Sequence, residues 1–156
     1  MSTVVGTTLP GPVLDVLAPE ESLRPEGQCI VLVTVDPDGQ PRPCLLSVGE
    51  LLAMDDRRLR TAVWQTSRTT ANLDRGSPAL LVVAAPPDAF HIRTLPRRLP
   101  DAPPSPLARF ELDVISVEVD GHDGLPVTQP MWFAAKDGYG PEVLAMWRRQ
   151  HASLRA

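Results

Sequence analysis

Apolar residues in this chain gather in short runs of strand length rather than in long helical stripes. Gln28–Val35 is rich in β-branched residues and apolar on both faces, which is typical of a buried strand. The sequence Asp-Pro-Asp-Gly at Asp36–Gly39 predicts a tight turn, because proline suits its second position and glycine accepts the left-handed conformation. We therefore expect a return strand over Arg42–Val48, with Pro41 and Pro43 restricting its beginning to a sheet edge or a bulge.

Further runs of the same kind follow the first hairpin and end in turn-forming residues. The strands they predict are Arg58–Trp64, Ala79–Ala85, Phe90–Leu95, Phe110–Val119 and Pro130–Ala135. Gly49–Arg58 carries no clear pattern and is expected to be a looser connection with a helical turn. The proline-rich segment Arg93–Leu107 is expected to be a long surface loop, since proline removes a backbone donor and restricts the residue before it.

The strand predicted over Phe110–Val119 contains an irregularity in its alternation. Phe110, Leu112 and Val114 share one face, but the apolar pattern then continues on Ile115, Val117 and Val119, which lie one residue out of phase. A β-bulge produces such a slip, and so does a strand that leaves one packing partner for another.

Three short segments have helical signals. Pro12–Ala18 has proline near its first turn, and Arg68–Arg75 follows the good N-cap Ser67 and stops at Gly76. The third helix spans residues 140–155, and one side of it carries Val143, Met146, Trp147, Gln150 and Leu154.

Strands outnumber helices, and no repeated strand–helix–strand rhythm appears, which favours a small antiparallel β-barrel of six to seven strands over a doubly wound sheet. We expect one domain over residues 1–156: an N-terminal arm with a short helix (1–27), the barrel with a proline-rich strand and loop at 86–107, short helices at the barrel ends, and the C-terminal helix at 140–155.

Composition narrows the classes of function. The net charge of −4 and the pI of about 5.3 give no bulk attraction to nucleic acid or to an anionic membrane. The sequence shows neither a signal-peptide pattern nor a membrane-spanning apolar run, so a cytoplasmic location is expected. Cys29 and Cys44 are expected to be reduced thiols, and the scattered histidines share no metal-ligand spacing with them, so no metal site is expected.

The sequence Ser67-Arg68-Thr69-Thr70 at the predicted helix start has two interpretations. Ser67 can cap the helix, with the threonines incidental. Alternatively, the free N–H groups, the three hydroxyls and the Arg68 guanidinium can hold a phosphate. Arg42 likewise is either a solvated edge arginine or a side chain that faces a ligand, with Ser47 further along the same strand.

The order of these motifs resembles the pyridoxamine 5′-phosphate oxidase-like family of FMN-binding split barrels. Strand, Asp-Gly turn and strand are followed by Ser-Arg-x-x-x-Asn-Leu, which is carried here by Ser67, Arg68, Asn72 and Leu73. The next strand opens with Ser77-Pro78 where the family often has Asn-Pro. Arg42–Ser47, "RPCLLS", is similar to the Arg-x-Val-Leu-Leu-Lys strand of the oxidase, with Ser47 standing in the place of its lysine.

The resemblance implies a split β-barrel that binds FMN, with a phosphate held by Ser67, Arg68, Thr69 and Thr70 and flavin contacts from Arg42 and Ser47. It also implies a homodimer with the cofactor in a cleft between subunits, in which half of Phe110–Val119 would pack against the partner. Its functional implication is an oxidoreductase of unknown substrate with unknown catalytic residues. The alternatives are a split barrel that uses the deazaflavin F420, and a non-catalytic barrel that holds a flavin, haem or no ligand.

Overall fold

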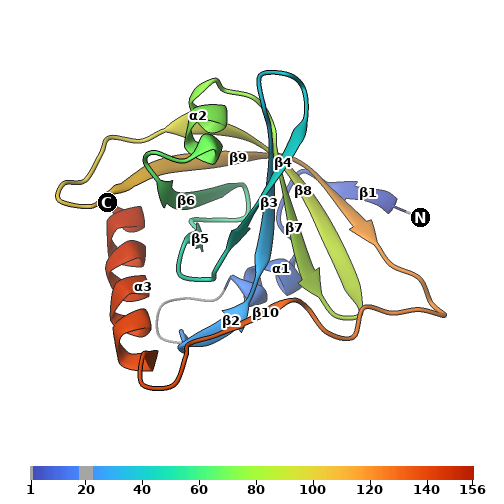
Figure 1. The fold of residues 1–156 in the computed structure, drawn as a ribbon. Helices are drawn as coiled ribbons and strands as arrows, with labels where there is room; N and C mark the ends of the chain where they lie inside the picture. The colour runs from blue at the N-terminus through green and yellow to red at the C-terminus, as the bar shows by residue number, and fades with distance from the viewer. Residues whose placement is uncertain (1, 18–22) are drawn as a thin grey trace.

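A curled antiparallel sheet is the main feature of the computed structural model, which describes residues 2–17 and 23–156 (Figure 1). Within those residues the sheet has eight strands, seven of them in the order β4-β3-β7-β8-β9-β6-β5, while β1 pairs with β9. The strands are β1 (Ser2–Gly6), β3 (Ile30–Val35), β4 (Pro41–Leu46), β5 (Leu51–Ala53), β6 (Arg58–Trp64), β7 (Ala79–Ala85), β8 (Asp88–Arg98) and β9 (Leu107–Asp120). The end strands β4 and β5 do not pair with each other, so the mainly β fold predicted from the sequence is confirmed as a split barrel.

The strand predicted over Gln28–Val35 is interrupted at Cys29. Its first residue belongs to β2 (Glu26–Gln28), which pairs with β10 (Trp132–Ala134) in a separate two-stranded sheet. The N–H of Cys29 donates to the carbonyl of Met131 at 2.8 Å. The chain therefore changes its hydrogen-bonding partner at Cys29, an event that apolar composition cannot reveal.

The β3–β4 hairpin has the predicted turn and the predicted edge. Gly39 has φ +84°, and its N–H donates to the carbonyl of Asp36 at 2.9 Å. Pro41 and Pro43 both lie in β4, at the end of the sheet path, where a proline leaves no central ladder hydrogen bond unmade.

Strand β9 contains the bulge that its phase slip predicted. Arg93 of β8 lies opposite Ser116, whereas the next residue, Thr94, lies opposite Val114, so Ile115 has no opposite residue. The extra residue restores the alternation of inward- and outward-facing side chains along β9. As a result, both Leu112 and Val117 are fully buried in the same core. The expectation that one half of this strand packs against a partner subunit is therefore wrong for Val117.

Two segments expected to be irregular contain strands. Leu51–Ala53 forms β5 within the predicted connection, and β8 continues to Arg98 through part of the predicted proline-rich loop. Pairing between β7 and β8 ends at Ala79 and Thr94. Pro96 therefore faces only β9, which explains why a proline is tolerated there.

The three helices of the described residues lie where the sequence predicted them: α1 (Gly11–Val16), α2 (Arg68–Asp74) and α3 (Gly140–Arg155). The last residue of the first predicted helix, Ala18, lies outside the described residues. No helix in the described part of the chain has the length and apolar character needed to cross a membrane.

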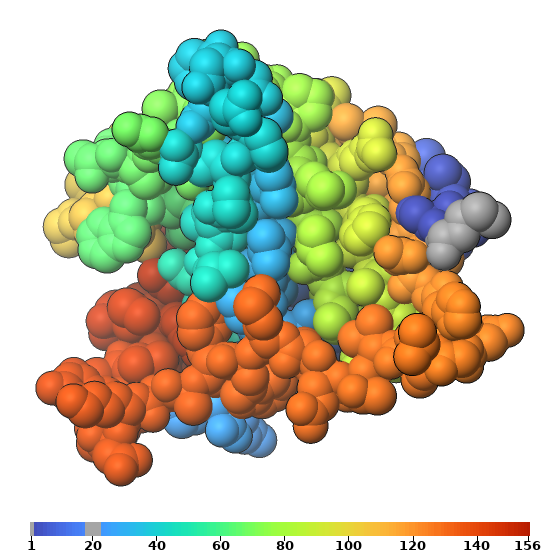
Figure 2. Space-filling view, turned by 45° about the vertical axis from the view of Figure 1, so that its right-hand side comes forward, coloured from blue at the N-terminus to red at the C-terminus, as the bar shows by residue number. Residues whose placement is uncertain are grey.

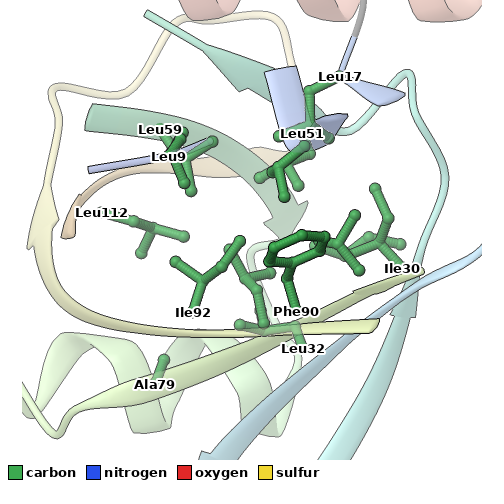
Figure 3. Close-up of a cluster of buried hydrophobic side chains, with 14 of the residues drawn as sticks. Leu9, Leu17, Ile30, Leu32, Leu51, Leu59, Ala79, Phe90, Ile92 and Leu112 are labelled. Atoms are coloured by element: carbon green, nitrogen blue, oxygen red, sulfur yellow. The ribbon is translucent and has the colours of Figure 1, made fainter. Parts of the chain in front are cut away.

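The main core lies inside the curled sheet and is mostly aliphatic, with two phenylalanines (Figure 3). Val13 of α1 is fully buried against it, which shows that α1 closes one end of the barrel. A second, smaller cluster lies on the outside of the sheet under α3, formed by Leu52, Ala62, Leu107 and Leu154.

Helix α3 is held on the sheet by more than apolar packing. Its buried residues are Trp147, His151 and Leu154, whereas Met146, predicted on the buried side, is 40% exposed. The His151 Nε2–H donates to the carbonyl of Val48 at 2.8 Å.

The last carbonyls of α3 accept hydrogen bonds from arginines of the sheet. Arg60 donates to Leu154 at 2.7 Å, and Arg109 donates to Ser153. Since the end of a helix carries unpaired carbonyls and partial negative charge, these two arginines stabilise the docked helix.

Candidate anion-binding site

The first turn of α2 is capped by Ser67. The backbone of Ser67 is extended, and its Oγ accepts a hydrogen bond from the N–H of Thr70 at 3.1 Å. The Thr70 hydroxyl donates to the carbonyl of Trp64 in β6 at 2.7 Å and accepts from the Ser67 hydroxyl at 3.1 Å. The capping interpretation of Ser67 is therefore confirmed, and the Thr70 hydroxyl is used to anchor the turn to β6.

Thr69 connects the same turn to the other side of the split. Its side chain is buried and lies near Cys44 of β4, the edge strand. Burial raises the pKa of the Cys44 thiol, and the nearby Thr69 only partly opposes that rise. Helix α2 thus reaches both sides of the split barrel, with Thr70 hydrogen-bonded to β6 and Thr69 beside β4.

Arg42 lies at the start of β4 and forms a hydrogen-bonded ion pair with Asp36. Its Nε lies 2.8 Å from each carboxylate oxygen, and its Nη2 lies 2.6 Å from Oδ2. The buried Asn72 of α2 also donates to Asp36 at 2.8 Å and to the Thr34 hydroxyl at 3.0 Å. Asp36 and Asn72 therefore fix the Arg42 side chain beside α2.

Asp36 stays ionised far below the usual range of a carboxyl group. Hydrogen bonds from Arg42 and Asn72 lower its pKa to about 2, and the positive charges of Arg42 and Arg68 act in the same direction. The two arginines predicted as ligand contacts therefore lie near one carboxylate, although they come from β4 and α2.

Arg68 is exposed and lines a cleft of about 410 Å³ between α2 and the hairpin turn, together with Asp36, Pro37, Asp38, Ala71, Asn72 and Arg75. It makes no ion pair or hydrogen bond with any residue that the structure describes. Arg75 is partly used, because its Nη2 donates to the carbonyl of Val35 at 2.6 Å.

The donor set around the first turn of α2 fits a phosphate. The N–H groups of Arg68 and Thr69 belong to the first turn, where an α-helix offers no internal acceptors, and Arg68 adds a positive charge. Of the predicted hydroxyls, those of Ser67 and Thr70 already have partners within the protein, and Thr69 is buried. An anion there would meet backbone N–H groups and guanidinium rather than free hydroxyls.

Ser47 is not brought to this group. It follows the other end of β4, five positions from Arg42, which corresponds to about 16 Å of extended chain. Its N–H and hydroxyl both donate to Glu50 at 2.8 Å, and the residue is buried. The observed role of Ser47 is to hold the turn between β4 and β5.

Sequence reasoning assigned no site role to Asp36 or Asn72. The sequence predicts Asp36 only as a turn residue and Asn72 only as part of the helix motif. The available signal was their combination, because an acceptor in the turn and an amide on the helix can together orient an arginine between them. Within the described residues, no three His, Cys, Asp or Glu side chains form a group that could hold a metal ion.

No protein-family model matches the chain. An uncharacterised protein, YclD of Bacillus subtilis, is 27% identical over 136 residues, which cover 82% of this chain and 83% of YclD.

Solved structures with similar folds include a putative pyridoxamine 5′-phosphate oxidase of Lactobacillus delbrueckii. Its TM-score is 0.57 and its sequence identity is 19%, and the match covers 75% of this chain and 98% of that protein. Another putative pyridoxamine 5′-phosphate oxidase, from Listeria innocua, matches at a TM-score of 0.51 and 15% identity. This match covers 69% of this chain and 94% of that protein. These likenesses confirm the resemblance at the level of the fold: the chain has the split β-barrel architecture of these putative oxidases.

Proposed function

We propose that this protein binds FMN and is an oxidoreductase. The observation that carries the proposal is that Arg42 and Arg68, from different elements, both lie near Asp36 beside α2. Arg42 is paired with Asp36, so the available positive charge is that of Arg68, and with the unpaired N–H groups of the first turn it matches the hydrogen-bonding capacity of a phosphate monoester. The similar folds of the putative pyridoxamine 5′-phosphate oxidases support the choice of a flavin phosphate.

In this proposal Arg68 and the N–H groups of Arg68 and Thr69 hold the phosphate. Arg42, held by Asp36 through Nε and Nη2, offers its remaining Nη1 to the same ligand. Ser67 shapes the turn through its cap rather than by binding the ligand. A bound flavin would supply the electron-transfer chemistry, and the protein would supply binding and orientation.

A second candidate function is a barrel without flavin, in which this turn is only structural. The hydrogen bonds of Ser67 and Thr70 within the protein and the burial of Thr69 favour it, because they leave no hydroxyl that is both exposed and unpaired.

The test is a titration of the purified protein with FMN and with riboflavin, followed by flavin fluorescence. We expect FMN to bind more tightly than riboflavin, and Arg68→Ala to weaken FMN binding by about tenfold or more while leaving riboflavin unchanged. Arg57→Ala, which removes an exposed arginine outside the cleft, is the matched control. Equal affinities for FMN and riboflavin, or no binding of either, would favour the structural role. The same titration with F420 tests the deazaflavin alternative.

We also propose that the protein is a homodimer. Strands β4, β3 and β7 lie side by side on one face of the molecule (Figure 2). The outer side of these strands carries partly or fully exposed apolar side chains in register, with Val31 between Leu45 and Val82, and Val33 beside Leu80. A continuous apolar sheet face of this kind is typical of a surface that a partner covers. A second copy, which presents the same uncharged face, is a complementary partner.

A further inference from the structure

A second cleft, of about 530 Å³, lies on the outer side of the sheet, between α3, the end of β6 and the loop before β9. Trp64, Leu107 and Met146 give it apolar walls, and Trp64 and Met146 are 62% and 40% exposed. Large apolar side chains that stay exposed around one concave surface are typical of a binding site. The volume is within the range of small-molecule sites, which is about 300–1,000 Å³.

Gln150 of α3 lines this cleft, and its amide oxygen is shielded from water behind the cleft surface. The Gln150 Oε1 is buried and has no hydrogen-bond partner among the residues that the structure describes. An acceptor of this kind is normally satisfied, so a donor from a ligand would remove an energetic penalty.

The side chains of the cleft give it positive charge. Arg149 and Arg109 are in its lining, no acidic side chain of the described residues is among them, and the one negative group there is the terminal carboxylate of Ala156. Arg109 already donates to the carbonyls of Pro100 and Ser153. Arg149 is exposed and makes no ion pair within residues 2–17 and 23–156. The cleft therefore presents an available cation beside an unsatisfied acceptor.

We propose that this cleft binds a flat, apolar carboxylic acid that carries a hydrogen-bond donor on its ring. The ring lies against Trp64 and Met146, the carboxylate pairs with Arg149, and the Gln150 amide rotates into the cleft so that its Oε1 accepts from the ring donor. This cleft shares no lining residue with the cleft that contains Arg68, and the proposal does not depend on FMN binding.

Isothermal titration calorimetry with three small probes tests this assignment. Indole-3-acetate has the ring, the N–H donor and the carboxylate; naphthalene-1-acetate lacks the N–H; tryptamine replaces the carboxylate with an ammonium group. We expect indole-3-acetate to bind, naphthalene-1-acetate to bind more weakly, and tryptamine not to bind.

Matched variants assign the contacts. Arg149→Gln should weaken the affinity for indole-3-acetate by about tenfold or more. Arg148→Gln, which changes an exposed neighbour outside the cleft, should leave this affinity unchanged. Gln150→Leu should abolish the preference for indole-3-acetate over naphthalene-1-acetate.

Three results would overturn the proposal. The first is that neither acid binds at millimolar concentration. The second is that the Arg149→Gln and Arg148→Gln variants bind indole-3-acetate equally well. The third is that FMN displaces indole-3-acetate, since the cleft would then belong to the cofactor site. Failure of FMN to bind leaves this proposal standing, so the two proposals fail independently.

Discussion

Gly49 shows how a single residue decides whether α3 can dock. A Cβ at this position would lie 2.0 Å from Cγ of Trp147, whose side chain is buried under the helix. No side chain fits there, so the glycine is required by a close approach rather than by backbone conformation.

We predict that Gly49→Ala destabilises the protein by about 1–3 kcal/mol, because an overpacked contact forces Trp147 to move. Urea denaturation measures the loss. Gly11→Ala is the control, since a Cβ there meets nothing within 4 Å. Equal stabilities of the two variants would contradict the close approach of Gly49 to Trp147.

Asp36 gives a prediction about pH. The hydrogen bond from Arg42 is the largest cause that lowers its pKa from 3.8 to about 2. A depressed pKa in the folded state means that Asp36 contributes stability above pH of about 4, and that this contribution is lost as the pH falls towards 2. Asp36→Asn should remove this part of the pH dependence and lower the stability at pH 7. Denaturation curves at several pH values from 2 to 7 measure both effects, and parallel profiles for the two proteins would exclude the role of Asp36.

At the scale of elements, α2 is a bridge as well as a candidate ligand site. Its first turn hydrogen-bonds to β6 through Thr70 and places Thr69 beside Cys44 of β4, and Asn72 hydrogen-bonds to Thr34 of β3. Loss of its cap should therefore also lower the stability of the barrel.

We expect Ser67→Ala to lower stability by about 1 kcal/mol, because the N–H of Thr70 loses its acceptor. Ser67→Asp restores a capping oxygen and should recover most of that stability, but its negative charge should weaken FMN binding. Thermal denaturation and FMN titration separate the two effects, with Thr66→Ala, an exposed neighbour, as control. If Ser67→Asp binds FMN as well as the natural protein does, the phosphate does not lie at this turn.

Helix α3 depends on Arg109 at its end. We predict that Arg109→Met costs about 1.5–3 kcal/mol, since its charged hydrogen bonds to the carbonyls of Ser153 and Pro100 are lost. Hydrogen exchange should become faster in α3 before it does so in the barrel strands. Arg148→Met, on the exposed side of the same helix, should leave the exchange rates unchanged.

At the scale of the whole molecule, the apolar outer face of β4, β3 and β7 predicts the oligomeric state. Sedimentation equilibrium should give twice the chain mass of 17.0 kDa. Val82→Glu, in the middle of the face, should give a monomer, because a dimer would bury its charge without a partner. Leu125→Glu, at a 79% exposed position outside the face, should leave the dimer intact. A natural protein that sediments as a monomer would exclude this interface.

Local sequence signals predicted much of the fold. Residues 58–64 and 79–85 form strands with the predicted bounds, because their runs of apolar and β-branched residues are bounded by clear turn or cap residues. The Asp-Pro-Asp-Gly turn and the Ser67 cap were predictable because each depends on a few adjacent residues. Leu51–Ala53 was missed, since a three-residue edge strand exists only through its pairing with β6.

The sequence by itself determined the hairpin turn, the cap of α2, the phase slip of β9 and the edge position of the proline-containing strand, because these follow from the conformational limits of adjacent residues. Only the tertiary structure decided the rest. It brings Asp36 to Arg42 and Asn72 to Asp36, sets Thr69 and Thr70 on opposite sides of the split, and separates Ser47 from the site. These arrangements join residues from different strands and helices, and their geometry is set by how the elements pack rather than by any local preference.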